Sequence, residues 1–244
     1  MGNVLVNEAS LQNIADAIRV KNGSTEKYLP SEMPSAIEGI QSGGTTTQAT
    51  EYMIMLGECF KNVNFEPLTE LHIKVGTKLE NPQYHTACLR GTFFGSTGLK
   101  KIKISTKESD VLFNIQNLMY NCKELEVFDL TDFKVKLDIA TQAFYGCNSL
   151  REIKGILDFS NVTNTSVMFN LCYALESISF KENTIHSSIA FNFCSLLSDE
   201  SIESIIDGLA TVETSQTLTF PATVKAKLTD AQISQITSKN WTLA

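Results

Sequence analysis

Four cysteines recur at a near-constant spacing, and this spacing limits the possible folds more than any other feature. Cys122, Cys147 and Cys172 are separated by 25 and 25 residues, and Cys194 follows after 22. Self-similarity at this period predicts a chain made of successive structural units, because each unit buries its apolar side against its neighbours. Equivalent residues of successive units should therefore lie next to one another in rows.

Aligning the sequence on the cysteines reveals further rows. Ser96 takes the cysteine position in an earlier copy, and Phe65 takes it in a degenerate first copy. The spacing L-x-x-L-x-L after each cysteine predicts one short strand per unit, with all strands parallel. The expected inward rows are Leu68, Leu99, Leu125, Leu150, Leu175 and Leu197; Leu71, Ile102, Phe128, Ile153 and Ile178; Ile73, Ile104, Leu130 and Phe180, with Gly155 as a gap; and Phe93, Met119, Phe144, Phe169 and Phe191.

The cysteines themselves favour a structural interpretation. Six cysteines in 244 residues are too few for a disulfide scaffold, and none has zinc-like spacing. Metal ligands must converge on one point, whereas thiols at repeat spacing are one unit apart. We therefore expect a buried row of reduced thiols that behave as small hydrophobic groups, with no metal or cofactor.

The pattern [AFM]-[FY]-x-x-C-x-x-L-x-x-[IF]-x-[LF] in residues 92–197 resembles the BspA-like class of leucine-rich repeats. Proteins of this class occur on bacterial surfaces and among phage structural proteins. The resemblance implies an α/β leucine-rich-repeat solenoid with a parallel sheet, which we expect over residues 51–197.

The C-terminal part changes to a helical period. Ser198 is a good N-cap for a helix with Ile202, Ile205, Ile206 and Leu209 on one face. A strand at 217–220 follows, and then Thr229 to Gln232 form a capping box for a second helix with Ile233 and Ile236 inward, which Asn240 ends before Trp241. Residues 198–244 are thus predicted to form a helix–strand–helix cap over the last repeat.

The first 42 residues predict a helical hairpin, followed by a flexible Gly/Thr linker at 43–50. The run 11–40 resembles an N-terminal segment of tail-fibre and baseplate-associated proteins from phages and prophages of Gram-positive bacteria. A hairpin this short cannot bury its apolar faces alone, so we expect it to attach or oligomerise the protein. A homotrimer is the first choice and docking onto another tail protein is the second. The residues assigned to this role are Leu11, Ile14, Ile18, Met33, Ile37 and Ile40.

Composition excludes other classes. The formal net charge of -7 and the pI near 5.1 argue against binding to nucleic acid. Apolar runs of membrane-spanning length are missing, as are the basic and apolar regions of a secretory signal, so we expect neither membrane insertion nor export by that route.

Three outward rows, two on the strands and one on the turns, are the candidates for ligand binding. On the strands, Lys100, Glu126, Arg151 and Glu176 alternate in sign, as do Lys103, Asp129 and Lys154 in the row from His72 to Ser179. These charges can form cross-strand ion ladders or bind a polar ligand. On the turns, Phe94, Tyr120 and Tyr145 can stack on sugars or pack on the neighbouring unit, and Asn170 and Asn192 continue their row.

The sequence offers no recognisable catalytic motif, since His72, His85 and His186 lie in unrelated contexts. We therefore expect a non-enzymatic phage or prophage tail appendage protein, located in the virion tail, that binds a host surface glycan or protein and contacts other tail proteins. The alternatives are a BspA-type adhesin on the bacterial cell surface and a polysaccharide-degrading tail enzyme, which would need paired carboxylates in a cleft.

Overall fold

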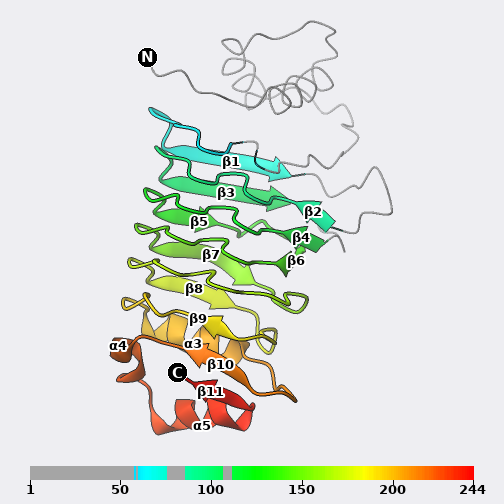
Figure 1. Cartoon of the computed structure of the whole chain (residues 1–244), viewed down its shortest axis with the longest axis vertical. Coiled ribbons are helices and arrows are strands. Elements are labelled where there is room, and N and C mark those ends of the chain that lie inside the picture. Colours follow the sequence, from blue (N-terminus) through cyan, green and yellow to red (C-terminus); the bar gives the residue numbers. More distant parts are fainter. Residues whose placement is uncertain (1–57, 59, 76–85, 107–111) are drawn as a thin grey trace, which may run out of the picture. The chain divides into compact units, whose positions relative to one another are not determined.

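The computed structural model describes residues 58, 60–75, 86–106 and 112–244 (Figure 1). The chain divides into two units, Met1–Glu51 and Tyr52–Ala244, and every described residue belongs to the second. The predicted hairpin and linker lie outside the described residues, so both stay predictions. Within the described part, no helix has the length and apolar character to cross a membrane.

The protein is α/β, with mainly parallel strands and few helices. The largest sheet has the strand order β1-β3-β5-β7-β8, and all of its pairings are parallel. Its register places Leu71 beside Ile102, Ile102 beside Phe128, and Phe128 beside Ile153, as the sequence rows predict. The strands of this sheet are β1 (Glu70–Val75), β3 (Lys101–Thr106), β5 (Val127–Asp129), β7 (Glu152–Leu157) and β8 (Ser177–Phe180).

Two smaller parallel sheets were not predicted, although one of their strands was, since the strand expected at 217–220 is present as β10. The other strands of these sheets have two to four residues, too few for a clear alternation of apolar and polar side chains. One sheet has the order β2-β4-β6, from β2 (Thr86–Cys88), β4 (Leu112–Asn114) and β6 (Lys136–Ile139). The other has the order β11-β10-β9, from β9 (Ile189–Ala190), β10 (Gln216–Thr219) and β11 (Trp241–Leu243).

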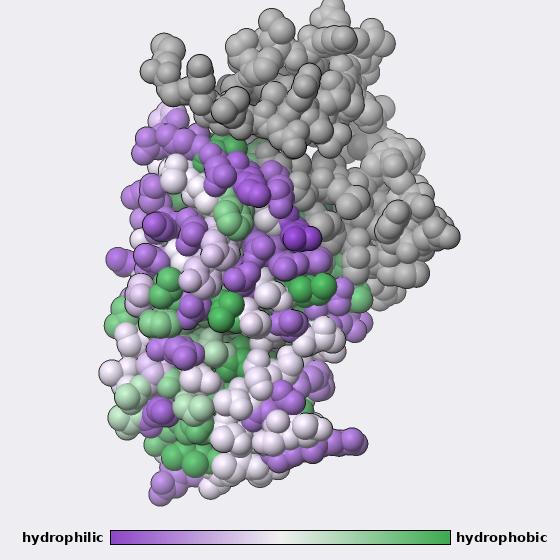
Figure 2. Space-filling model, viewed as in Figure 1, coloured by the Kyte–Doolittle hydropathy of each residue, from purple (hydrophilic) through white to green (hydrophobic). Residues whose placement is uncertain are grey.

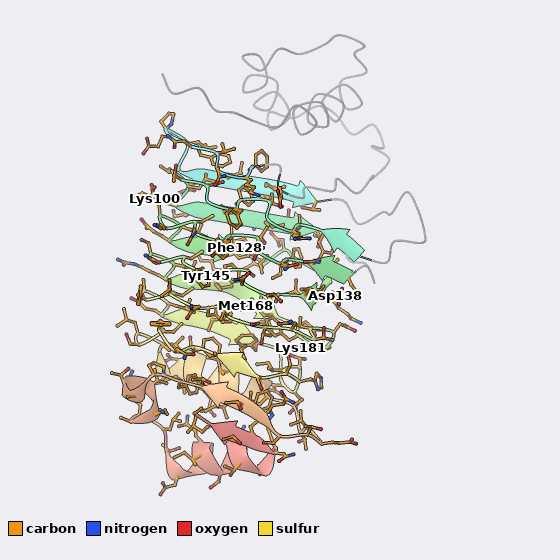
Figure 3. The ribbon with its side chains drawn as sticks, viewed as in Figure 1. Lys100, Phe128, Asp138, Tyr145, Met168 and Lys181 are labelled. Carbon is orange, nitrogen blue, oxygen red and sulfur yellow. The ribbon has the colours of Figure 1, made fainter. Side chains whose placement is uncertain are left out.

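The core is built from the predicted inward rows. Phe93, Met119, Phe144, Phe169 and Phe191 are each 0% exposed. The rings of Phe144 and Phe169 stack with centroids 5.9 Å apart, and those of Phe169 and Phe191 with centroids 4.9 Å apart. In Figure 3, Phe128 and Met168 lie toward the middle of the described unit, whereas Lys100 and Lys181 lie at its rim. Full burial of one such side chain contributes about 1.5–3 kcal/mol.

The first predicted copy differs from expectation. Leu68 is 46% exposed, so its inward assignment is wrong. Phe65 does not occupy the cysteine position either. The Ser96 hydroxyl donates to the carbonyl of Phe60, and the ring of Phe60 stacks on Phe93, so Phe60 is the equivalent of Phe93 in this copy. Phe93 lies three residues before Ser96, and Phe60 lies three residues before Val63. These contacts put Val63 at the cysteine position. The chain has two more residues between Val63 and β1 than between Ser96 and β3, and this insertion displaces Phe65 and Leu68.

Gly155 is not a gap in the core but the site of a β-bulge. The register between β7 and β8 shifts between Glu152 and Ile156, so that Leu157 pairs with Phe180 and fills the row. Gly155 has φ 97°, and a Cβ there would collide with the backbone of Leu130. The bulge also turns Ile156 outward, where it is 72% exposed.

The C-terminal part contains α3 (Asp199–Gly208), α4 (Ala222–Lys225) and α5 (Asp230–Ser238). The Ser198 side chain caps α3, and its four predicted apolar residues are buried. Thr229 and Gln232 form the predicted capping box of α5. Ile236 is buried, but Ile233 is 37% exposed, so its inward assignment is wrong. Since α5 buries only a narrow stripe around Ile236 against β11 and α3, a residue nearer its N-terminus stays in contact with solvent.

Strand β11 and helix α4 were missed by the sequence analysis. Asn240 has φ 65° and ends the preceding helix, as predicted, but the chain then enters β11. Trp241 is buried, and its Nε1 donates to the carbonyl of Ala210 at 2.8 Å. The Lys239 ammonium donates to three carbonyls near the end of α3, those of Ile206, Asp207 and Leu209.

Candidate ligand-binding surfaces

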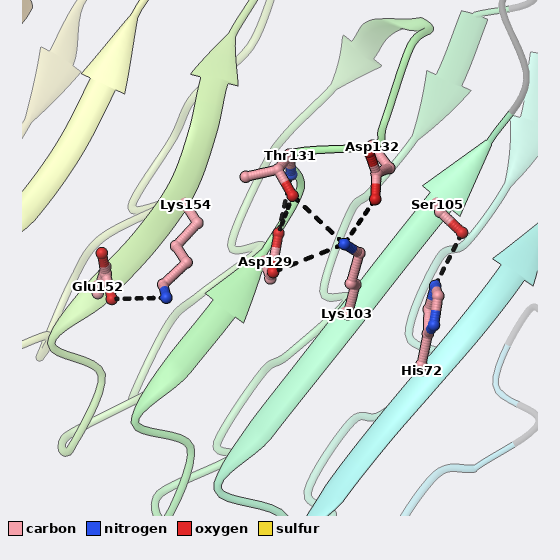
Figure 4. A network of polar contacts seen from close by, with 8 residues as sticks. All are labelled: His72, Lys103, Ser105, Asp129, Thr131, Asp132, Glu152 and Lys154. Carbon is pink, nitrogen blue, oxygen red and sulfur yellow. Dashed lines mark hydrogen bonds and ion pairs between the residues drawn. The ribbon is translucent and has the colours of Figure 1, made fainter.

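A polar network covers the outer face of the largest sheet (Figure 4). The Lys103 Nζ lies 2.5 Å from Asp132 Oδ2 and 4.0 Å from Asp129 Oδ2, and it donates to Thr131 Oγ1 at 3.4 Å. The hydrogen bond from Lys103 holds the pKa of Asp132 below its usual value. The predicted pair of Lys103 with Asp129 is thus present, but it is the longer of the two contacts.

Asp129 is fixed by its own turn more than by its neighbours on the sheet. Its Oδ1 accepts hydrogen bonds from the Thr131 N–H at 2.9 Å and from the Thr131 hydroxyl at 2.7 Å. Burial alone would raise the pKa of Asp129, but these bonds and the charges of Lys103 and Lys154 leave the pKa lowered. Thr131 and Asp132 were not predicted as part of this network, although the spacing Asp-x-Thr is typical of such turns.

The same turn occurs once more beyond β7. Asp158 Oδ1 accepts from the Ser160 N–H at 3.0 Å, and Asp158 Oδ2 lies 2.7 Å from Lys181 Nζ. The motif Asp-x-Ser/Thr followed by pairing with a lysine of an adjacent segment is therefore a recurrent structural unit of this molecule. Its presence at both places favours a role in shaping the chain after β5 and β7.

The predicted ion ladders form only in part. Lys100 and Glu126 pair across strands at 3.3 Å, whereas Lys154 pairs at 3.6 Å with Glu152 of its own strand. His72 Nε2 and Ser105 Oγ are 2.9 Å apart on neighbouring strands. The sheet face thus pairs positive and negative groups with each other, and exposed pairs of this kind contribute about 0–1 kcal/mol each.

The three aromatic residues of the turns stack on one another. The rings of Phe94 and Tyr120 are 4.5 Å apart at 4°, and those of Tyr120 and Tyr145 are 4.7 Å apart at 7°. Lys61 Nζ lies 5.2 Å from the centroid of the Phe94 ring. Neighbours therefore cover the inner ring faces, and this row presents ring edges and tyrosine hydroxyls to a ligand.

The backbone of these turns has two rows of left-handed residues that the sequence analysis did not predict. The first row precedes the cysteine position by five residues: Glu58, Gly91, Asn117, Gln142 and Val167. The second directly precedes it: Asn62, Gly95, Asn121, Gly146 and Leu171. Gly and Asn adopt this conformation most readily, so their recurrence in the second row was the signal that could have revealed the turns, whereas the first row has no such pattern.

The cysteine row lies inside these turns. Each of three thiols donates a hydrogen bond to a backbone carbonyl in the preceding turn. Cys122 donates to Phe93 at 2.9 Å, Cys147 to Met119 at 2.9 Å, and Cys172 to Phe144 at 3.0 Å. Burial raises the pKa of the Cys122 and Cys172 thiols to about 12. All four cysteines of the row are free and buried, as predicted. Over the described residues, no group of three or more His, Cys, Asp or Glu side chains could hold a metal ion.

An acidic depression of about 530 Å³ lies beside α3, where Glu182, Asp199, Glu200, Glu203 and Asp207 contribute to its lining. Two of these carboxylates are occupied by amides of α5. Gln232 Nε2 donates to Glu203 at 2.7 Å, and Gln235 Nε2 donates to Asp207 at 2.8 Å. These hydrogen bonds join α5 to α3, which gives the carboxylates a structural role.

Tyr173, Phe193 and Leu196 were not predicted as surface residues, yet they are 47%, 37% and 53% exposed. They lie on the turns that carry the last two cysteines. In the view of Figure 2, hydrophobic residues interrupt the hydrophilic surface more in the lower part of the described unit than at its top.

Comparisons of the chain with protein-family models, with curated proteins and with solved structures found no match.

Proposed function

We propose that the protein is a non-enzymatic tail appendage protein of a phage or prophage, and that its second unit is a leucine-rich-repeat solenoid of the BspA-like type. In this proposal residues 198–244 cap the solenoid, and the solenoid surface binds a component of the host surface. The N-terminal 42 residues attach the protein to the tail or to further copies of itself.

The observation that carries the proposal is the display of equivalent side chains in rows. Parallel register along β1, β3, β5 and β7 and the ring contacts of Phe94, Tyr120 and Tyr145 repeat similar surface groups at about the spacing of neighbouring strands. Such rows suit an extended ligand that offers the same chemical group many times, as surface polymers do. Several weak contacts made together raise the effective affinity.

Binding to intact Gram-positive cells and to their isolated walls tests this function. We expect the fluorescently labelled full-length protein to bind walls saturably and to release no reducing sugar from them. Release of reducing sugar would favour the polysaccharide-degrading alternative. Failure to bind walls from any host of a broad panel would contradict the proposed function.

Light scattering tests the proposed role of residues 1–42. We expect the full-length chain to be a trimer and residues 51–244 to be a folded monomer. A full-length monomer would contradict the trimer and leave docking onto another tail protein. An oligomer that survives truncation would place the interface in the second unit.

A further inference from the structure

Three neighbouring turns of the second unit form a surface without charged groups. The stretches 139–150, 159–175 and 187–198 contain no Asp, Glu, Lys, Arg or His, although 19% of the chain is charged. The corresponding earlier turns do carry charges, among them Glu58, Lys61, Arg90, Lys123 and Glu124. We call the exposed residues of the three uncharged stretches the neutral turn surface.

The three stretches lie side by side. Backbone hydrogen bonds join the first to the second, from Gly146 N–H to the Asn170 carbonyl at 2.8 Å and from Phe144 N–H to the Met168 carbonyl at 3.1 Å. The Thr165 hydroxyl donates to the Ser188 carbonyl at 2.5 Å and joins the second stretch to the third. The uncharged segments therefore form one continuous part of the molecule.

The chemistry of this surface combines ring faces with neutral hydrogen-bonding groups. The rings of Tyr173 and Phe193 meet edge to face, at 5.6 Å and 81°, so they do not cover each other as the stacked rings of Tyr120 and Tyr145 do. Exposed amides and hydroxyls accompany these rings, from Asn148, Thr163, Asn164, Ser166, Asn192 and Ser195. Amides and hydroxyls both donate and accept hydrogen bonds, as the hydroxyls of a sugar do.

The backbone adds a second argument. Val167 is β-branched and 41% exposed, yet it has φ 45° at a position where the other turns have unbranched residues, namely Glu58, Gly91, Asn117 and Gln142. A β-branched residue in this conformation is strained. Strained backbone residues cluster at functional sites, and Val167 belongs to the neutral turn surface.

We propose that the neutral turn surface is a binding site for uncharged carbohydrate, with Tyr173 and Phe193 as the stacking residues. The inference rests on the proposed function and names the ligand class of the host component. An anionic polymer would find no cation on this surface to pair with, whereas a neutral glycan presents apolar C–H faces to the rings and hydroxyls to the amides. On the sheet face, by contrast, Lys100, Lys103 and Lys154 are already paired with carboxylates.

The test uses the full-length protein, an array of neutral oligosaccharides of glucose, galactose, rhamnose and N-acetylglucosamine, and poly(glycerol phosphate) as the anionic probe. We expect binding to at least one neutral glycan and none to the anionic polymer. Tyr173→Ala and Phe193→Ala should each weaken this binding at least tenfold, and Asn192→Ala should weaken it less. Ile156→Ser removes an even more exposed apolar side chain, from the sheet face, and should leave binding unchanged.

Thermal melts of each variant check that it is folded, and Asn192→Ala provides a readout that does not depend on an aromatic residue. Equal binding by the wild type and by all three turn variants would overturn the proposal, as would binding to the anionic polymer alone. If intact walls are bound but the loss of affinity follows Lys103→Ala instead, the proposed function stands and this site is wrong. If walls are not bound at all, the proposed function itself fails.

Discussion

Successive chain segments stack in the same way on the sheet face and on the turn side of the second unit, but the side chains that they bring together differ. On the sheet face, stacking places Lys100 beside Glu126 and Lys103 beside Asp129, so neighbouring charges cancel. On the turn side, it places each thiol beside a carbonyl and each aromatic ring beside another ring. We infer from this comparison that the buried rows, on the turns and on the inner face of the sheet, determine stability, whereas the charged outer face contributes little.

The largest expected effect comes from the phenylalanine row under the turns. Phe169→Ala should lower the free energy of unfolding by about 3–5 kcal/mol, because it leaves a cavity between two stacked rings. Phe193→Ala is the matched control, since Phe193 is 37% exposed whereas Phe169 is 0% exposed. Urea denaturation of both variants measures the difference. A similar small loss for both would show that the row does not hold the turns together.

The left-handed rows should have the next largest effect. Gly146 has φ 73°, and a Cβ there would collide with Oδ1 of Asn121. Gly146→Ala should therefore cost more than the roughly 1–2 kcal/mol of the left-handed conformation alone. In an Asn121→Gly background the collision is absent, so the loss in free energy of unfolding caused by Gly146→Ala should fall to about 1–2 kcal/mol. Denaturation of the two single variants and the double variant measures this coupling, and strict additivity would contradict it.

The thiol row predicts that stability falls in alkaline solution. Burial raises the pKa of Cys122 and Cys172 to about 12, so the folded chain retains protons that the unfolded chain releases above its pKa near 9. Their contribution is therefore complete below about pH 8.5 and is lost as the pH rises toward 12, by about 1.4 kcal/mol per pH unit for each thiol. Unfolding measured from pH 7 to 11 should show a smaller slope for Cys172→Ala. Equal slopes would mean that this thiol ionises in the folded state.

The smallest effect is expected on the sheet face. Lys103→Ala removes contacts to Asp129, Thr131 and Asp132, yet all of them are partly exposed to solvent. We expect a loss of stability well below that of Phe169→Ala, decreasing further at high salt, because water and ions screen exposed ion pairs. Urea denaturation at low and high ionic strength measures it. A loss comparable to that of Phe169→Ala would reverse the comparison between the two surfaces.

Periodic features were predictable from the sequence, and irregular ones were not. The inward rows, the strand register, the cap of α3 and the capping box of α5 follow from spacing and from local hydrogen bonding, which the sequence displays directly. The insertion before β1, the bulge at Gly155 and the strand β11 each depend on contacts with a neighbouring segment. A single residue pattern does not contain those contacts, so Leu68, Phe65 and Ile233 were misassigned.

The candidate surfaces follow the same division. The residues of the three outward rows could be named from the alignment, but the partners Thr131, Asp132 and Ser105 come from loops or from diagonal positions on the next strand. The stacking of Phe94, Tyr120 and Tyr145 was one of two stated alternatives. The exposed rings of Tyr173 and Phe193 were missed because they lie next to the cysteine position, outside the row in which aromatic residues were sought.

Thiol labelling tests the central claim, that the cysteine row forms the interior of stacked turns, most directly. The native full-length protein is exposed to a maleimide at neutral pH, with and without denaturant, and each labelled cysteine is identified by mass spectrometry. The structure predicts that Cys122, Cys147, Cys172 and Cys194 resist labelling in the native state and react together on unfolding, because all four are buried. Rapid native labelling of two or more of them would contradict the inward row and the stacking built on it.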